Sequence, residues 1–396
     1  MSYLKIWWQS KSPISRFLIG FIGLMLAFYV FYYSPIYEKY IMDSLLSVQA
    51  RLSNSILNLL GFDTDTSGDI IAGSDFRVSI KNGCDGIEAT ALYVCAILAF
   101  PFVSFRSKLK GLFFGVLTLS VLNLFRIAGL YLAGVYWKSA FEFLHLHGGV
   151  IVFTMIAILT LADLGFSNKI SLRSKVMSGV LKFIVFCLLL YTAFMLLLKI
   201  PMVESGINSG FRNSVEWLLQ QAFPEAYIET QNFVDANNQM DPNSFYLVYG
   251  NPKTIAEEEA YAAQQQLKEY KISTFSFQFF IFQMFVVPFV FLFAIFLASP
   301  IDWKKKLINT GFAALALLTL ILLKTLLLTL FSIANTQIGI YTLSESQLSW
   351  VFHIISAMTL GFSVMFVFCI WLLLGFRNSK FNSLFSNYIN QFKNEA

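Results

Sequence analysis

Charged residues are scarce in this chain. Only 13% of the 396 residues are Asp, Glu, Lys or Arg, whereas an average soluble domain has about 25%. Hydrophobic residues make up 57%, and the mean hydropathy is +0.66. Long apolar runs are typical of membrane-spanning helices, because about 20 residues cross a hydrocarbon core about 30 Å thick. The composition therefore excludes an ordinary soluble enzyme and predicts a polytopic membrane protein.

Cysteine and histidine are also rare, with four and three copies. Cys95, Cys187 and Cys369 lie inside apolar runs, where cysteine usually serves as a small buried hydrophobe, so we expect no disulfide with Cys84. No Cys-x-x-Cys or other metal spacing occurs, and we predict neither a metal nor a cofactor. The sequence also lacks a basic stripe with interleaved aromatics, which argues against a nucleic-acid partner.

Hydropathy predicts an all-α architecture of about eight transmembrane helices. Lys and Arg gather at one set of span ends, as in 106–110 and 304–306, whereas the 333–349 loop has neither. By the positive-inside rule, both termini are predicted to be cytoplasmic. We expect a multi-pass protein of the cell inner (plasma) membrane. The predicted spans are 17–34, 86–104, 111–134, 147–166, 178–200, 275–298, 308–332 and 350–376.

The first long outer segment covers 35–85. Apolar residues within 41–60 recur at near-helical spacing, which predicts an amphipathic helix lying at the membrane interface or packed on the bundle. The mixed pattern of 69–80 predicts one or two strands or an extended loop.

The second outer segment, 201–273, holds ten of the 23 acidic residues. Its run Glu257–Glu259 opens a helix-like stretch that is either a solvated face or a docking surface. We divide the chain into a transmembrane core, 1–175, and a C-terminal four-helix region with this extracytoplasmic segment, 176–396.

Three features are unusual for a membrane protein. Cys84 lies in the polar stretch Asn82-Gly83-Cys84-Asp85-Gly86, directly before an apolar run. Arg126 is embedded in the third span, about 22 Å along it at about 1.5 Å per residue. His145 and His147 open the fourth span. The predicted topology brings all three to the outer side at similar depth.

Each feature alone has a structural explanation. A membrane cysteine is usually a packing residue, an arginine near a helix end can reach the headgroups, and a histidine at a span end can simply hydrogen-bond at the interface. Together they suit acyl transfer. A thiolate attacks a carbonyl, a histidine moves protons, and a guanidinium, which cannot act as a base, stabilises an oxyanion.

These residues resemble the exosortase/archaeosortase family of membrane cysteine transpeptidases, and most closely the exosortase H type. The matching stretches read NGCDGIEATALYVCAILAFP (82–101), NLFRIAGLYLAG (123–134) and FEFLHLHGGVIVF (141–153). The chain departs from the family pattern at Gly148-Gly149, where an aromatic residue is expected.

The resemblance implies a cysteine peptidase or transpeptidase that sorts exported proteins. Such enzymes recognise a C-terminal signal made of a short motif, a transmembrane helix and a basic tail. They cleave at the motif through a thioester and transfer the protein to a surface acceptor. By position, Cys84 would be the nucleophile, Arg126 the oxyanion stabiliser or a substrate orienter, and His145 the acid/base. His147 remains an alternative, since two residues apart on a helix point about 200° apart.

Supporting roles are predicted for two further residues. Glu88, four residues after Cys84, would share its helix face and either pair with Arg126 or receive a proton. Asn123 is a second candidate, and Asp85 is expected in the first helical turn. Two other classes stay open: a thiol–disulfide oxidoreductase, and a transporter or assembly scaffold in which Arg126 contacts substrate or a lipid phosphate.

Overall fold

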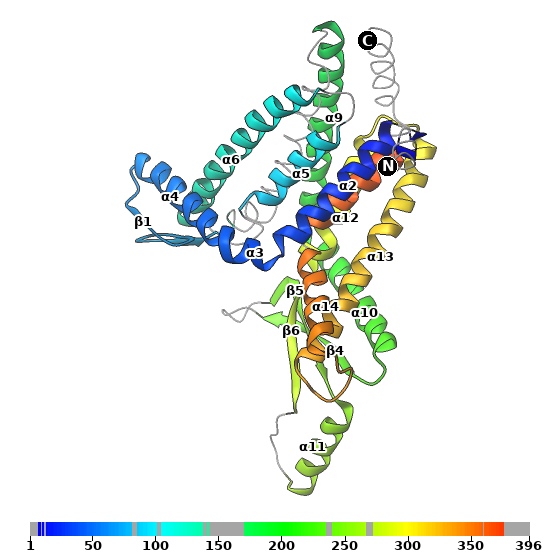
Figure 1. Ribbon diagram of the computed structural model, residues 1–396. Coiled ribbons are helices and arrows are strands. Elements are labelled where there is room, and N and C mark those ends of the chain that lie inside the picture. Colours follow the sequence, from blue (N-terminus) through cyan, green and yellow to red (C-terminus); the bar gives the residue numbers. More distant parts are fainter. Residues whose placement is uncertain are drawn as a thin grey trace. The chain divides into compact units, whose positions relative to one another are not determined.

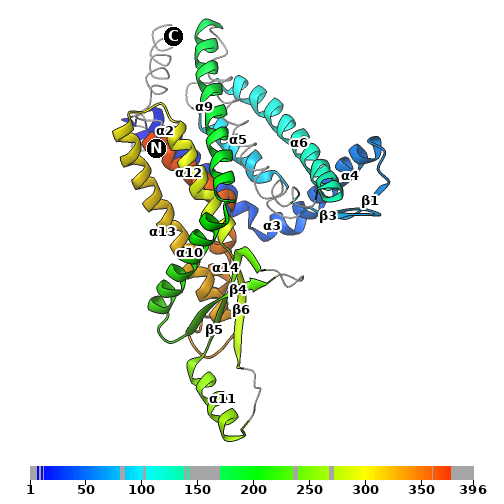
Figure 2. The same ribbon diagram turned by 180° about the vertical axis from the view of Figure 1, so that it is seen from behind.

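Figures 1 and 2 show the computed structural model. Its internal contacts divide the chain into two compact units. Unit 1 comprises Met1–Phe186, Ala298–Asp302 and Phe368–Ala396, and unit 2 comprises Cys187–Leu297 and Trp303–Val367. The predicted functional division at 175 stays a prediction. The structure describes residues 7–8, 10–11, 13–80, 85–100, 104–137, 141, 170–234, 240–266, 272–358 and 360–375.

Helices dominate the described residues. Three of them are long and apolar enough to cross a membrane: Ser15–Tyr32, Phe105–Tyr136 and Trp303–Asn335. Two bent helix pairs raise that number to five if each pair counts as one span. The chain is thus a mostly helical protein with several candidate spans. The predicted count of eight stays a prediction, and its fourth span, 147–166, lies outside the described residues.

Unit 1 is built on three apolar helices: α2 (Pro13–Tyr32), α5 (Ile87–Ala99) and α6 (Phe105–Tyr136). Helix α5 packs against both of the others. With 13 residues, it is shorter than the predicted span 86–104, and it covers only about 20 Å at about 1.5 Å per residue.

A GxxxG pattern in α6 explains how closely α5 approaches it. The Tyr93 hydroxyl of α5 donates a hydrogen bond of 2.8 Å to the Gly111 carbonyl. A Cβ atom on Gly115, one turn further, would lie 2.1 Å from the same ring. Small residues let helices approach closely inside a membrane. Gly115 therefore leaves room for the fully buried ring of Tyr93, and the Gly111 carbonyl accepts its hydroxyl.

The part of the chain between α2 and α5 forms a second layer of unit 1. Helix α4 has one buried face made of Leu46, Ala50, Ser53 and Leu57, which confirms the predicted amphipathic helix and shows it packed on α6. The layer's elements are α3 (Pro35–Tyr37), the π-helix η1 (Glu38–Met42), α4 (Asp43–Leu59), β1 (Thr64–Ser67), β2 (Ile70–Gly73) and β3 (Arg77–Ser79).

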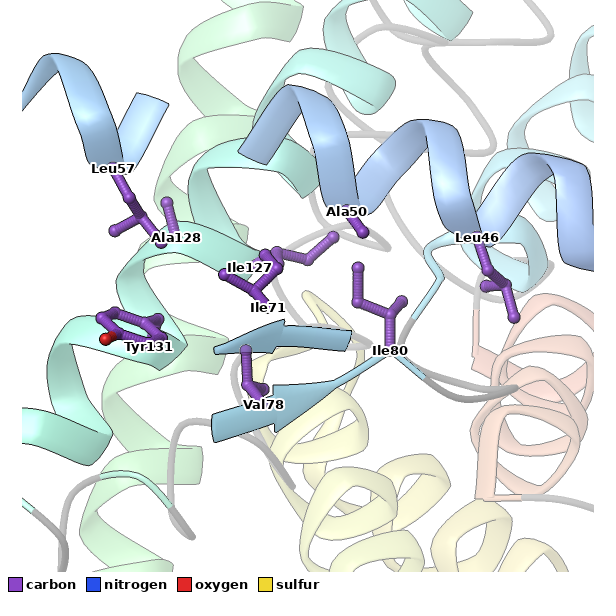
Figure 3. Packing of buried hydrophobic residues seen from close by; sticks show 9 residues of the cluster. All are labelled: Leu46, Ala50, Leu57, Ile71, Val78, Ile80, Ile127, Ala128 and Tyr131. Atoms are coloured by element: carbon purple, nitrogen blue, oxygen red, sulfur yellow. The ribbon is translucent and has the colours of Figure 1, made fainter. Parts of the chain in front are cut away.

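The three strands form an antiparallel sheet in the order β1-β2-β3. Figure 3 shows its apolar face meeting α4 and the C-terminal part of α6. This cluster consists of Leu46, Ala50, Leu57, Ile71, Val78, Ile80, Ile127, Ala128 and Tyr131. The sequence predicted one or two strands or an extended loop in 69–80; the structure has β2 and β3 there and adds β1. The layer fixes the part of α6 that carries Arg126, because Ile127 and Ala128 belong to the cluster.

Unit 2 contains a second antiparallel sheet, in the order β4-β5-β6. Strands β5 and β6 flank the segment that carries α11 (Figure 1). The elements up to this point are α10 (Pro201–Ala222), β4 (Tyr227–Val234), β5 (Met240–Gly250), α11 (Pro252–Gln264) and β6 (Thr274–Phe280). They are preceded by α9 (Ile170–Leu197), which crosses the unit boundary.

The sheets correct two predictions. The architecture is not all-α, since two three-stranded sheets accompany the helices. The predicted span 275–298 is also wrong at its start, because β6 occupies Thr274–Phe280 and pairs with β5. Its phenylalanines alternate with polar residues, a strand pattern, and Phe279 stacks on Phe245 at 4.9 Å between ring centroids. Helical backbone begins only at η3 (Phe282–Val286) and continues as α12 (Val287–Ala298).

The last predicted span, 350–376, is broken. Helix α14 (Glu345–Ala357) is bent by 65° from the helical stretch that follows, formed by α15 (Leu360–Ile370) and η4 (Trp371–Gly375). The Nζ of Lys324, in α13 (Trp303–Asn335), donates a hydrogen bond to the Met358 carbonyl at this break. A helix end leaves carbonyls without helical donors, so Lys324 has a structural role here.

Candidate active site

The backbone carbonyl of Asp85 is held from two helices. The Nδ2 of Asn123, on α6, donates to it at 2.9 Å, and the Nε2 of Gln49, on α4, donates at 2.8 Å. Asp85 is bonded to Cys84, and Cα atoms joined by a trans peptide lie about 3.8 Å apart. The residue after the predicted nucleophile is therefore tied to two separate elements of unit 1.

The carboxylate of Asp85 is held as well. It accepts a hydrogen bond of 3.2 Å from the Tyr32 hydroxyl of α2 and another of 3.2 Å from the Ile87 amide. Only 2% of the residue is exposed. Burial raises the pKa of this carboxyl, although both hydrogen bonds and the charge of Arg126 oppose the rise. The expectation that Asp85 lies in the first turn is wrong, since it precedes the helix and accepts from its first amide.

Gly86 is required by both its backbone and its surroundings. It is the N-cap of α5, with φ of +72°, a left-handed conformation that side-chain-bearing residues avoid. A Cβ atom at this position would lie 2.8 Å from Cγ of Asn123. The glycine thus lets the chain turn from Asp85 into α5 while Asn123 packs directly over it.

Arg126 lies one turn beyond Asn123 on α6. Its Nη1 donates to the Asn123 Oδ1 at 3.5 Å, and the side chain is half-buried. The amide of Asn123 therefore faces Arg126 with its oxygen and Asp85 with its nitrogen. The structure brings together Arg126, Asn123 and Asp85, the residue bonded to Cys84.

The reasoning that placed Glu88 beside Cys84 does not hold. Helix α5 begins at Ile87 with Gly86 as its N-cap, so Cys84 precedes the helix. The four-residue helical spacing therefore does not relate it to Glu88. Glu88 is half-buried in the first turn of α5, where a carboxylate favourably meets the helix dipole.

The segment leading to the histidines starts from the same layer. The Phe141 ring lies 5.3 Å from that of Phe76, and both rings pack against the cluster in Figure 3. His145 follows four residues later in the sequence. Cys84, His145 and His147 themselves lie outside the described residues, so their mutual geometry stays a prediction.

Two residues that hold Asp85 were not predicted from the sequence. Gln49 was one polar residue among many on an amphipathic helix, and Tyr32 was one of several aromatics at the end of α2. Their partner lies 36 residues away from Gln49 and 53 from Tyr32, and no local pattern indicates such a contact. Among the described residues, no group of three His, Cys, Asp or Glu side chains could hold a metal.

Comparison with known families now adds to this geometry. Residues 7–162 match the family model of transmembrane exosortase (Exosortase_EpsH). Over these residues the chain is similar to the transmembrane exosortases. The match covers less than half of the 396 residues and contains every predicted site residue. No curated protein and no solved structure matches the chain.

The exosortase match spans all of the elements that converge on Asp85. Helices α2, α4, α5 and α6 each supply a residue that bonds, caps or packs on the Asp85–Gly86 segment. Residues from four helices of unit 1 therefore hold the Asp85–Gly86 segment in place. Positioning of this kind lowers a reaction barrier because the orientation is set before the reaction begins.

Proposed function

We propose that this protein is a membrane-embedded cysteine transpeptidase that cleaves a C-terminal sorting signal of exported proteins. The observation that carries the proposal is the double hydrogen bond to the Asp85 carbonyl, reached through Asn123 from Arg126. These hydrogen bonds link Arg126, the predicted oxyanion stabiliser, through Asn123 to Asp85, which follows the predicted nucleophile in the sequence, and they support the proposal in this way. The family match supports a transpeptidase role for this region.

The proposed reaction uses three side chains of the enzyme, those of Cys84, Arg126 and His145. The Cys84 thiolate attacks the scissile carbonyl, and the guanidinium of Arg126 stabilises the oxyanion that develops there. His145 donates a proton to the leaving amine, and the peptide C–N bond breaks to leave a thioester. A surface acceptor nucleophile then gives up its proton to the histidine, attacks the thioester and releases the thiolate.

The location follows from the predicted topology. The active site lies on the extracytoplasmic side of the inner membrane, where exported proteins arrive. The partners are exported proteins that carry the short motif, the transmembrane helix and the basic tail. Membrane lipid surrounds the enzyme, and the acceptor is a surface molecule.

The deciding experiment follows cleavage of an epitope-tagged exported protein with such a signal, co-expressed with the full-length enzyme. We expect Cys84→Ala to abolish cleavage, while Cys187→Ala, at a buried cysteine of α9, preserves it. Arg126→Lys should lower the rate at least about 100-fold, the usual loss when an oxyanion donor is removed, since lysine lacks the planar fork.

The histidines are separated in the same assay. His145→Ala should abolish cleavage and His147→Ala should preserve most of it. Normal cleavage by Cys84→Ala, at wild-type membrane levels, would refute the enzyme and favour the transporter or scaffold alternative.

A further inference from the structure

A cavity of about 520 Å³ adjoins the Asp85–Gly86 segment. It is lined by residues of α2, α4, α5 and α6 and lies wholly within unit 1. Its volume falls in the range of about 300–1,000 Å³ that is usual for ligand sites. Asp85, which follows the predicted nucleophile Cys84 in the sequence, itself lines the cavity.

The lining of the cavity changes from polar near Asp85 to apolar further along. Its lining next to Asp85 includes the polar side chains of Gln49 and Asn123, whereas further along it includes Phe28, Val94 and Leu119. Apart from Asp85, the lining contains no charged residue. Burying a charge without a partner is strongly unfavourable, so the lining selects an uncharged, mostly apolar occupant and excludes the basic tail of a sorting signal.

The direction of the cavity identifies which part of a substrate fits. On α5 its lining runs from Ile87 to Cys95, which is about 12 Å at about 1.5 Å per residue. The cavity therefore runs from the start of α5 along the helix, in the direction in which α5 enters the predicted span. A sorting signal bound at Cys84 would continue the same way, because its transmembrane helix follows the scissile bond.

We infer that this cavity is a specificity subsite that binds the first apolar side chains after the scissile bond, at the start of the substrate's transmembrane segment. The inference rests on the proposed function and names the substrate residues that the enzyme would recognise beside the scissile bond. The hydrogen-bonded Asp85 segment marks its polar end, and the apolar walls of α2, α5 and α6 select the substrate.

Two positions on α6 allow a matched test. Ser120 and Thr118 are both exposed hydroxyl residues of this helix, but only Ser120 lines the cavity. Ser120→Trp places a large ring in the subsite, and Thr118→Trp places the same ring outside it. We expect Ser120→Trp to slow cleavage of the tagged exported protein at least tenfold, with Thr118→Trp close to wild type.

A second measurement does not depend on turnover. A photo-crosslinking benzoylphenylalanine is placed at 120 or at 118 in the full-length Cys84→Ala enzyme, which should retain the uncleaved substrate. At 120 we expect an adduct with the tagged protein that maps to the beginning of its apolar segment, and at 118 none. A phospholipid adduct alone at 120, or equal substrate adducts at both positions, would overturn the inference.

The two proposals fail in different ways. Normal cleavage by Cys84→Ala would remove the proposed function. If Cys84→Ala blocks cleavage but Ser120→Trp cleaves like wild type and position 120 captures no substrate, the transpeptidase stands and the subsite is refuted.

Discussion

Gly86→Ala should lower the free energy of unfolding through backbone strain and through the loss of one hydrogen bond in the candidate site. The new residue must adopt φ of +72°, which costs an L-amino acid about 1–2 kcal/mol. Its Cβ would also lie 2.8 Å from Cγ of Asn123. Asn123 must then move and give up its 2.9 Å hydrogen bond to the Asp85 carbonyl, a further loss of about 0.5–1.5 kcal/mol. The expected destabilisation is about 1.5–3.5 kcal/mol.

A double-mutant cycle separates the two contributions. Asn123→Ala alone should cost about 0.5–1.5 kcal/mol, since Gln49 still donates to the Asp85 carbonyl. In the Asn123→Ala background there is no side-chain amide left to displace, so Gly86→Ala should cost only the backbone strain of about 1–2 kcal/mol. The double variant should therefore be less destabilised than the sum of the single variants, by about 0.5–1.5 kcal/mol.

A control pair predicts coupling of the opposite sign. Combining Gly86→Ala with Gln49→Ala removes both donors from the Asp85 carbonyl, and an unsatisfied buried acceptor costs about 1–3 kcal/mol. That double variant should be more destabilised than the sum of its single variants.

The assay is reversible unfolding of the full-length protein in mixed micelles, with cleavage of the tagged exported protein followed in parallel. Independent sites add within about 0.3–0.5 kcal/mol. Additive free energies in both cycles would show that Asn123 does not couple Gly86 to Asp85, and the reasoning would be wrong.

Two further predictions concern stability. Because burial raises the pKa of Asp85, its favourable contribution is full below the unfolded pKa of about 3.9 and is lost as the pH rises through the folded pKa. The unfolding temperature of Asp85→Asn should therefore rise relative to wild type as the pH is raised above about 4, and a constant or falling difference would contradict this. Gly115→Ala should destabilise by about 1–3 kcal/mol through overpacking against Tyr93, whereas Gly129→Ala on the same helix meets open space and should stabilise by up to about 1 kcal/mol. Equal effects of the two alanines on unfolding would refute the close packing.

Local patterns predicted much of unit 1. The apolar runs of α2 and α6 and the spacing of the buried face of α4 are periodic in the sequence, so hydropathy and helical period reveal them. Arg126 and Asn123 were also predicted as site residues, because polar groups are conspicuous in an apolar helix.

The errors arose where pairing or chain direction decides the structure. The hydropathy of phenylalanine-rich β6 predicts a membrane helix, and only its pairing with β5 shows that it is a strand. No proline marks the break between α14 and α15 in the sequence. The Met358 carbonyl at this break accepts a hydrogen bond from Lys324 of another helix. Glu88 was assigned to the face of Cys84 because the sequence did not show that α5 begins only at Ile87.

By itself, the sequence determined that this is a membrane protein, which residues are costly enough in a membrane to be candidates for function, and which family its first part resembles. Those properties depend on composition, period and motif order, all of which are local. Only the tertiary structure decided how the candidates are supported: Tyr32, Gln49 and Asn123 meet at Asp85 from three different helices, and a cavity adjoins the same point. Such contacts depend on how the helices pack, and no local sequence pattern indicates which residues far apart in the chain will meet.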